Sequence, residues 1–228
     1  VKRLKVGDKV MMSAAVGCGA CASCLAGNVV NCANNAAGCY GLSHRLEGCQ
    51  AEAMRVPAAD FNATVIPEGI TTDQALMMTD SLATAWFGCR NAEISSGKTV
   101  AVVGLGPIGL MAVEGAFVLG AARVFAIDLV PERRKLAEQL GAIALDPADA
   151  PQIIAEMTKG RMVDSIVEAV GADATISLSL RLAAKRGTVS VIGVNQDRRF
   201  DFPMGRAFAM GLTFRIGTCS VPEEWPEL

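Results

Sequence analysis

The feature that most constrains this chain is a glycine-rich turn between an apolar run and a helical one. Residues 104–109 read Gly-Leu-Gly-Pro-Ile-Gly and follow the β-branched run Thr99–Val103. In that context G-x-G-x-x-G is typical of a dinucleotide-binding turn. Gly104 permits the tight turn, Gly106 lets the backbone approach a pyrophosphate, and Gly109 lets the following helix pack against the sheet. The alternative is an ordinary glycine-rich turn, which the acidic residue downstream disfavours.

That acidic residue is Asp128, which follows the apolar run Arg123–Ile127 and lies about 20 residues after the glycine-rich turn. A carboxylate here is expected to bond the 2′-OH of the adenine ribose and to repel a 2′-phosphate, so we favour NAD over NADP. Leu129, which is neither small nor basic, agrees with this choice. We interpret Arg133 and Arg134 as exposed helix residues, with Arg133 within reach of the ribose.

From Thr99 onward, apolar runs alternate with helical ones. The apolar runs do not alternate in polarity, as expected of strands that are covered on both faces. Six strands joined by right-handed helical crossovers predict an α/β fold with a doubly wound parallel sheet. We expect strands at Thr99–Val103, Arg123–Ile127, Ala144–Leu145, Asp164–Glu168, Thr188–Ile192 and Leu212–Ile216. We expect helices at Ile108–Leu119, Pro131–Leu140, Ala148–Thr158, Ala172–Ala183 and Pro203–Met210.

Upstream of the sheet, four of the eight cysteines are clustered with the spacing C-x2-C-x2-C-x7-C, at Cys18, Cys21, Cys24 and Cys32. Four thiolates converging on one point predict a closed structural zinc site that does no chemistry. Disulfides are one alternative, disfavoured in a chain that looks cytoplasmic. An iron–sulfur cluster is another, but the ferredoxin run places its fourth cysteine after three residues and before proline. The other cysteines read as small buried hydrophobic residues at Cys39, Cys49, Cys89 and Cys219.

The segment before the sheet has weaker patterns. Lys9–Met12 and Gln50–Pro57 are β-like, the second alternating in polarity with period two. A helix capped by Thr71 or Thr72 is expected to run through Asp80 to Asn91.

Charge and hydropathy exclude several classes of partner. The formal net charge of the 228 residues is −2, which argues against a nucleic-acid partner. Uninterrupted apolar runs are shorter than the roughly 18–20 residues that a membrane span needs. The first residues do not form a secretory signal, so we expect a soluble cytoplasmic protein.

The order of these parts resembles the zinc-dependent alcohol dehydrogenases of the medium-chain dehydrogenase/reductase superfamily. The resemblance also includes Val6–Val10, Glu47–Glu52 and Met78–Thr84. It implies hydride transfer between an alcohol and NAD, with a catalytic zinc as Lewis acid on the oxygen. It further implies part of a GroES-like, β-rich catalytic domain with the zinc lobe at about 17–33. The implied domains are 1–84, a Rossmann domain at 85–217, and the start of a return to the catalytic domain at 218–228.

The resemblance also implies site residues. Asp80 matches the third protein ligand of the catalytic zinc, and Thr84 matches a position on the nicotinamide side. The alternative for Asp80 is a solvated or capping residue, which its apolar sequence neighbours disfavour. The expected cofactor-binding residues are Gly104, Leu105, Gly106, Pro107, Ile108, Gly109, Asp128, Arg133, Val170, Ile192 and Val194.

One departure from the family pattern is decisive. The chain has a single histidine, His44, which is not in the family's Gly-His-Glu motif and reads as a surface residue. We therefore expect the cysteine and histidine ligands of the catalytic zinc to lie upstream of Val1, in a chain truncated at both ends. Two alternatives stay open: a zinc-free NAD(P)H reductase of the superfamily, and a catalytically inactive NAD-binding or structural fragment. Metal content would separate them.

The implied partners are a small alcohol or carbonyl substrate and a second copy of the chain. The Asp-type ligand and the short connection favour secondary alcohols, polyols or formaldehyde-type substrates. Leu212–Ile216 matches the edge strand across which family members pair, and an exposed apolar edge strand is a pairing surface on physical grounds. We expect a homodimer or homotetramer, with neither nucleic acid nor membrane as a partner.

Overall fold

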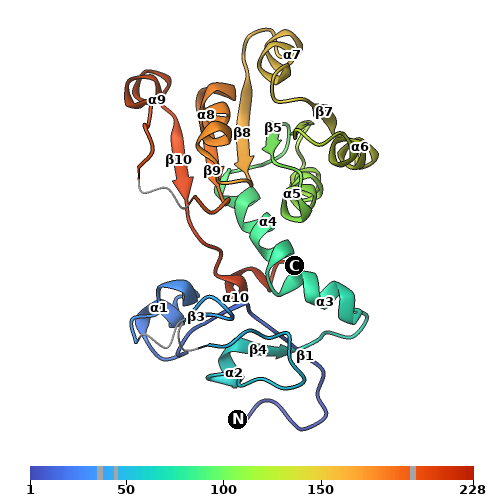
Figure 1. Cartoon of the computed structure of the whole chain (residues 1–228), viewed down its shortest axis with the longest axis vertical. Helices are drawn as coiled ribbons and strands as arrows, with labels where there is room; N and C mark the ends of the chain where they lie inside the picture. Colours follow the sequence, from blue (N-terminus) through green and yellow to red (C-terminus); the bar gives the residue numbers. More distant parts are fainter. Residues whose placement is uncertain (35–37, 44–45, 196–198) are drawn as a thin grey trace. The chain divides into compact units, whose positions relative to one another are not determined.

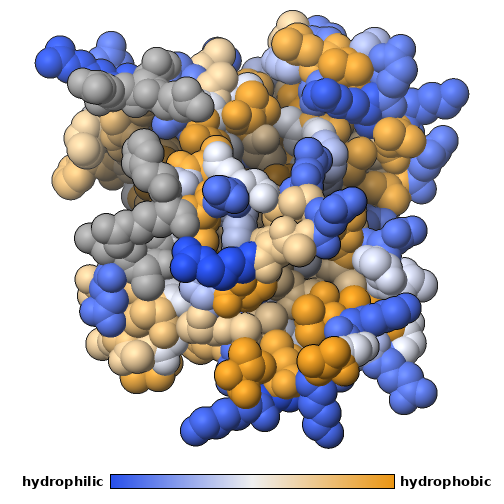
Figure 2. All heavy atoms as spheres, turned by 60° about the horizontal axis from the view of Figure 1, so that its bottom comes forward, coloured by the Kyte–Doolittle hydropathy of each residue, from blue (hydrophilic) through white to orange (hydrophobic). Residues whose placement is uncertain are grey.

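The structure, a computed structural model, describes residues 1–34, 38–43, 46–195 and 199–228. It divides into two compact units (Figure 1). Unit 1 comprises Val1–Ala83 and Thr218–Leu228, and unit 2 comprises Thr84–Gly217. On the face drawn in Figure 2, hydrophilic and hydrophobic side chains are interspersed.

Unit 2 is built on a six-stranded sheet in the order β10-β9-β8-β5-β6-β7, in which every neighbouring pair is parallel. This confirms the predicted doubly wound α/β fold. The order reverses beside β5, because β6 follows on one side of it and β8 lies on the other (Figure 1). The strands are β5 (Thr99–Val103), β6 (Arg123–Ile127), β7 (Ile143–Leu145), β8 (Val163–Glu168), β9 (Ala183–Val191) and β10 (Thr213–Ile216).

Helices cover both faces of this sheet. One apolar cluster joins α4, α5 and α6 to alternate strand residues such as Val100 and Val102. A second cluster joins α7 and α8 to the intervening residues, Ala101 and Val103 among them. This explains the continuous apolar strands, since both faces are buried. The helices are α4 (Ser81–Asn91), α5 (Pro107–Val118), α6 (Pro131–Gln139), α7 (Ala150–Met157), α8 (Asp173–Leu182) and α9 (Met204–Met210).

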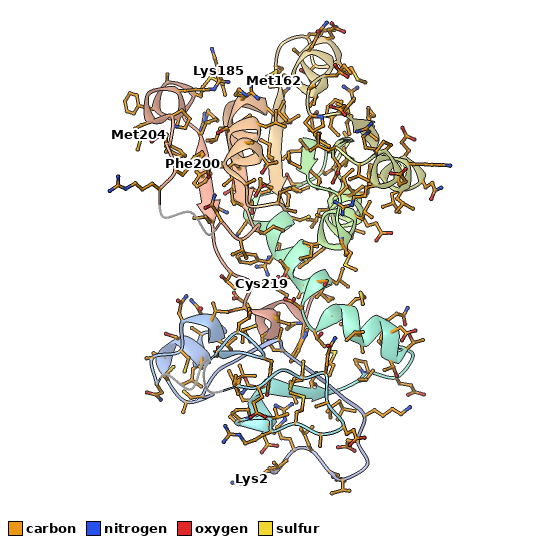
Figure 3. The ribbon with its side chains drawn as sticks, in the orientation of Figure 1. Lys2, Met162, Lys185, Phe200, Met204 and Cys219 are labelled. Atoms are coloured by element: carbon orange, nitrogen blue, oxygen red, sulfur yellow. The ribbon has the colours of Figure 1, made fainter. Side chains whose placement is uncertain are left out.

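Aromatic residues extend the second cluster toward the edge of the sheet. Phe200, in the segment between β9 and α9 (Figure 3), lies edge-to-face with Phe202, with ring centroids 6.4 Å apart. Phe202 packs in the same manner on Phe214 of β10, at 5.2 Å. Edge-to-face geometry is a favoured arrangement of such rings, so these contacts stabilise the packing of Phe200 and Phe202 on the edge strand β10.

The start of β9 differs from the prediction. Helix α8 ends at Leu182, and β9 begins at once at Ala183 instead of at Thr188. Val163 pairs with Ala183 whereas Ser165 pairs with Thr188, so the residues between them on β9 bulge from the ladder. The bulge depends on the pairing of β8 with β9, and the periodicity of the sequence does not predict it.

Unit 1 contains two short antiparallel pairs, β1 with β4 and β2 with β3. A small apolar cluster of Met11, Ala75 and Met78 packs against Trp225, whose indole N–H donates to the carbonyl of Met78 at 3.0 Å. The elements are β1 (Val10–Met12), β2 (Ala15–Val16), α1 (Ala22–Leu25), η1 (Val29–Asn31), β3 (Gly38–Cys39), α2 (Ala59–Asn62), β4 (Ala63–Val65), α3 (Thr72–Met78) and α10 (Val221–Glu224).

Three sequence predictions in unit 1 are wrong. Cys49, read from the sequence as a buried hydrophobic residue, is exposed. Gln50–Pro57 forms no strand; instead several of its residues line a cavity of about 370 Å³ together with Tyr40. The expected continuous helix from Thr72 to Asn91 is broken after Met78. The carbonyl of Thr79 accepts a hydrogen bond from the N–H of Ala14 at 3.1 Å. The N–H of Thr79 bonds to the carbonyl of Leu76, three residues back, which closes the last turn of α3.

The predicted helix start is confirmed: Thr71 caps α3 in a reciprocal capping box with Gln74. None of the helices in the described ranges is long and apolar enough to span a membrane.

Candidate functional site

The four clustered cysteines of unit 1 converge on one point. Their sulfur atoms all lie within 4.8 Å of one another, and all four are free thiols. Cys18 Sγ is 3.9 Å from Cys24 Sγ, and Cys21 Sγ is 4.0 Å from Cys32 Sγ. Two sulfurs on a tetrahedral zinc lie about 3.8 Å apart when each Zn–S bond is about 2.3 Å. The thiols therefore fit a four-coordinate zinc ion.

Backbone donors prepare part of this cluster for the thiolate form. The N–H groups of Ala20 and Cys21 donate to Cys18 Sγ at 3.4 and 3.3 Å, which lowers the pKa of Cys18 to about 6. Backbone N–H groups likewise lower the pKa of Cys21. Burial raises the pKa of Cys24 to about 12. Burial makes the thiolate of Cys24 costly, and a bound cation would offset that cost because metal ligation deprotonates a thiol.

The lobe is held in place by a residue that the sequence analysis missed. Asn62, fully buried at the end of α2, accepts from the N–H of Gly17 at 2.9 Å and donates to its carbonyl at 2.8 Å. Its amide also donates to the carbonyl of Pro57 at 2.7 Å. This side chain therefore fixes the start of the cysteine run. No local signal marks an asparagine for such a role, since Gly17 is remote in sequence.

The glycine-rich turn of unit 2 has the geometry of a phosphate-binding turn. Gly104 has φ +90°, a conformation that side chains disfavour, and a Cβ there would overlap Val170. Gly106 caps α5 with φ −66° and ψ −175°, and space beside it is open. A Cβ on Gly109 would overlap the carbonyl oxygen of Gly104. Pro107 occupies the first turn of α5, and the N-terminus of a helix leaves free N–H groups that favour anions.

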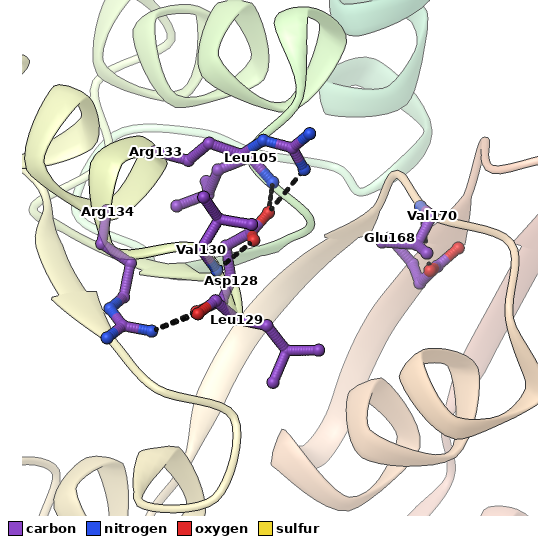
Figure 4. Close-up of polar contacts among 8 residues, drawn as sticks. All are labelled: Leu105, Asp128, Leu129, Val130, Arg133, Arg134, Glu168 and Val170. Carbon is purple, nitrogen blue, oxygen red and sulfur yellow. Dashed lines mark hydrogen bonds and ion pairs between the residues drawn. The ribbon is translucent and has the colours of Figure 1, made fainter.

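Asp128 lies at the end of β6 and is hydrogen-bonded to the glycine-rich turn (Figure 4). One oxygen, Oδ2, accepts from the N–H of Leu105 at 2.7 Å, and Oδ1 accepts from Val130 N–H at 2.8 Å. The guanidinium of Arg133 is 3.5 Å from Oδ2. Arg134 instead donates to the carbonyls of Asp128 and Leu129. The carboxylate is thus held next to the turn, and Leu129 is 74% exposed beside it.

The other predicted cofactor residues lie at the carboxyl ends of β8 and β9. Val170 and Val194 are 47% and 79% exposed, although both are apolar. Ile192 is half-buried and packs against the first core cluster. The resemblance also places Glu168–Gly171 at a strand end bordering the nicotinamide, but it assigned no role to Glu168 itself, whose buried carboxylate accepts the N–H of Val170 at 3.0 Å. Its signal was an acidic residue at the last position of a predicted strand.

The two residues that the resemblance implies for catalysis, Asp80 and Thr84, belong to different units. Asp80 is exposed at the break between α3 and α4, in unit 1. The charge of Asp80 contributes, after burial, to the raised pKa of Cys39. Among the described residues, the four cysteines alone form a group able to hold a metal, so Asp80 stays a predicted ligand. Thr84 is half-buried on α4, and His44 lies outside the described residues.

Comparison with known proteins agrees with this arrangement. Residues 107–228 match the model of the zinc-binding dehydrogenase family, and residues 1–68 match that of the alcohol dehydrogenase GroES-like domain. A probable zinc-binding alcohol dehydrogenase from Mycobacterium tuberculosis is 43% identical, over 100% of this chain and 59% of its own length. An alcohol dehydrogenase from Cupriavidus necator is 38% identical, over 83% of this chain and 55% of its own length.

The chain thus spans little more than half the length of these curated relatives. Among solved structures, alcohol dehydrogenase TADH from Thermus sp. ATN1 is similar over all of this chain and 66% of its own length. The TM-score is 0.94 and the sequence identity 35%, so the similarity covers both units.

Proposed function

This chain belongs to the zinc-dependent medium-chain dehydrogenase/reductase family, and we propose on that premise that the whole protein transfers hydride between an alcohol and NAD. The observation that carries the proposal is the Asp128 carboxylate bonded to the N–H of Leu105 in the glycine-rich turn. A carboxylate held at that place accepts the ribose hydroxyls of NAD and repels the 2′-phosphate of NADP.

The residues of unit 2 provide the parts of a dinucleotide site. The N–H groups at the start of α5 bind the pyrophosphate, and open space at Gly106 admits it. Asp128 orients the adenine ribose, with exposed Leu129 beside the base. When bound, the nicotinamide ring accepts or returns the hydride. Val170 and Val194 offer an apolar surface to that ring.

The remaining parts of the proposal concern the whole protein. In the whole protein a catalytic zinc would supply Lewis-acid chemistry at the substrate oxygen, and Asp80 would provide one carboxylate ligand for it. We propose secondary alcohols or polyols as the substrate class. We propose pairing of two copies along β10, which is an edge strand of the described sheet and exposes Ile216.

The cofactor assignment is tested by Asp128→Asn. The change keeps the shape of the side chain but removes its charge, so affinity for NADH falls and repulsion of NADPH is relieved. We expect the preference for NADH over NADPH to shrink by about tenfold, the scale of one charge-assisted hydrogen bond. Calorimetric titration of both cofactors measures it. The control is Asp149→Asn, the same change at an exposed residue without a capping hydrogen bond. A wild-type chain that prefers NADPH would contradict the assignment.

The role of Asp80 is tested in the protein at its natural full length. We expect Asp80→Asn to lower turnover of a secondary alcohol by about a thousandfold, because a neutral amide is a poor zinc ligand. Zinc content should fall from about two ions per chain to about one, the structural one. Asp73→Asn, an equal charge change in the first turn of α3, should alter neither quantity. Full activity of Asp80→Asn would favour a zinc-free reductase instead.

A further inference from the structure

Glu168, at the end of β8, is a fully buried acidic residue in the core of unit 2. Its Oε1 accepts hydrogen bonds from the N–H groups of Val170 and Gly171, both at 3.0 Å, and from the hydroxyl of Thr175 at 2.7 Å. Gly171 N–H is also 3.1 Å from Oε2. Burial raises the pKa of this carboxyl, and the donors offset part of that rise. An acid kept in such a place needs these bonds to compensate its desolvation.

The backbone of the same residue binds a second turn. The carbonyl of Glu168 accepts from the N–H of Ile192 at 2.9 Å and from that of Gly193 at 3.1 Å. Gly171 and Gly193 lie so close that a Cβ on either would overlap the backbone of the other. Glu168 is therefore bonded to both the turn after β8 and the turn after β9. These two turns are packed directly on one another.

The strand order places these turns on one half of the dinucleotide site. Asp128 lies at the end of β6, on one side of β5, and Glu168 lies at the end of β8, on the other. Figure 4 shows the two acidic residues well apart, each at the end of its own strand. Since Asp128 takes the adenosine half, the nicotinamide half extends over the ends of β8 and β9. Val170, which would overlap a Cβ on Gly104, borders both halves.

We propose that Glu168 is a positioning residue for the nicotinamide half of the dinucleotide. Its carboxylate holds the Val170–Gly171 turn, and its carbonyl holds the Ile192–Gly193 turn, so the exposed side chain of Val170 is fixed before the cofactor arrives. Glu168 itself is buried and does not touch the cofactor. The inference rests on the proposed function, because it needs a dinucleotide at this edge of the sheet. Ordering the turns in advance removes an entropic cost of binding.

The test compares NADH with ADP-ribose, which lacks the nicotinamide ring. Glu168→Gln has nearly the same shape, but its amide N–H would face the N–H of Gly171 and loosen that turn. We expect the affinity of the 228-residue chain for NADH to fall by about tenfold and that for ADP-ribose to change by less than about twofold. Thr175→Val removes one donor to Oε1, so we expect about a threefold loss for NADH alone. Calorimetric titration measures both ligands.

Ser165→Ala is the matched control, because this buried serine lies on the same strand and its hydroxyl has no partner among the described residues. It should alter binding of neither ligand. An equal loss of NADH and ADP-ribose affinity in both Glu168→Gln and Thr175→Val would show a merely structural role and overturn the inference. Unchanged NADH affinity in both would also overturn it. A wild-type chain that binds neither ligand would refute the dinucleotide site itself, and the inference with it.

Discussion

Replacing Gly106 with alanine is expected to abolish tight dinucleotide binding while leaving unit 2 folded. The backbone at Gly106 has φ −66°, which any residue adopts, and a Cβ there meets nothing within 4 Å. We therefore expect the free energy of unfolding to change by less than about 1 kcal/mol. The added methyl group occupies the space that the pyrophosphate needs, so NADH affinity should fall by roughly a hundredfold. Thermal unfolding and calorimetric titration measure the two effects.

Gly109→Ala should behave differently, although it lies only three residues away. Its Cβ would overlap the carbonyl oxygen of Gly104, and neither backbone can move cheaply. We expect a loss of about 3 kcal/mol in stability, at the upper end of overpacking effects, together with loss of NADH binding. Gly205→Ala, in α9, is the control, because space beside it is open and the turn is remote in sequence. Wild-type NADH affinity in Gly106→Ala would place the pyrophosphate elsewhere.

Removing one thiol from the cysteine cluster is expected to remove the metal. Cys24 is 1% exposed, and its sulfur is 3.9 Å from that of Cys18. We expect Cys24→Ser to reduce bound zinc from about one ion per chain to almost none, because a closed structural site needs all four ligands. Since the binding energy of a structural zinc is folding energy, unit 1 should become sensitive to protease. Metal analysis by mass spectrometry and limited proteolysis measure both effects.

A chelator strong enough to remove structural zinc should reproduce the Cys24→Ser result, with cleavage concentrated in unit 1. Cys49→Ser is the matched control, because Cys49 is an exposed cysteine of the same unit that lies outside the cluster. It should leave both zinc content and protease resistance unchanged. Zinc retained in Cys24→Ser at the wild-type level would contradict the four-thiolate site.

Much of unit 2 was predictable because its signals are local. The strands Thr99–Val103 and Arg123–Ile127 have the predicted bounds, since each is a β-branched run bounded by turn residues. The glycine-rich turn is equally local: φ +90° at Gly104 and the open cap at Gly106 depend on the absence of side chains. The site roles of these residues stay predictions until cofactor binding is measured.

The predictions that failed depend on contacts between remote segments. Gln50–Pro57 alternates in polarity, but strand formation needs a neighbour to pair with, and this segment has none among the described strands. The break after Met78 lies where the carbonyl of Thr79 accepts a hydrogen bond from Ala14, which is far away in sequence. Helical propensity alone would have continued the helix, so tertiary context decided the outcome.

The sequence by itself therefore determined the features that residue type and spacing produce: four thiols in one short loop, glycines where a backbone must turn or pack closely, and an acid at the end of β6. Only the tertiary structure decided which remote groups meet. Asn62 reaches Gly17, and Glu168 binds the turns that follow both β8 and β9. The physical reason is that a buried polar group must find its hydrogen-bond partners wherever the fold brings them, and sequence spacing does not encode that position.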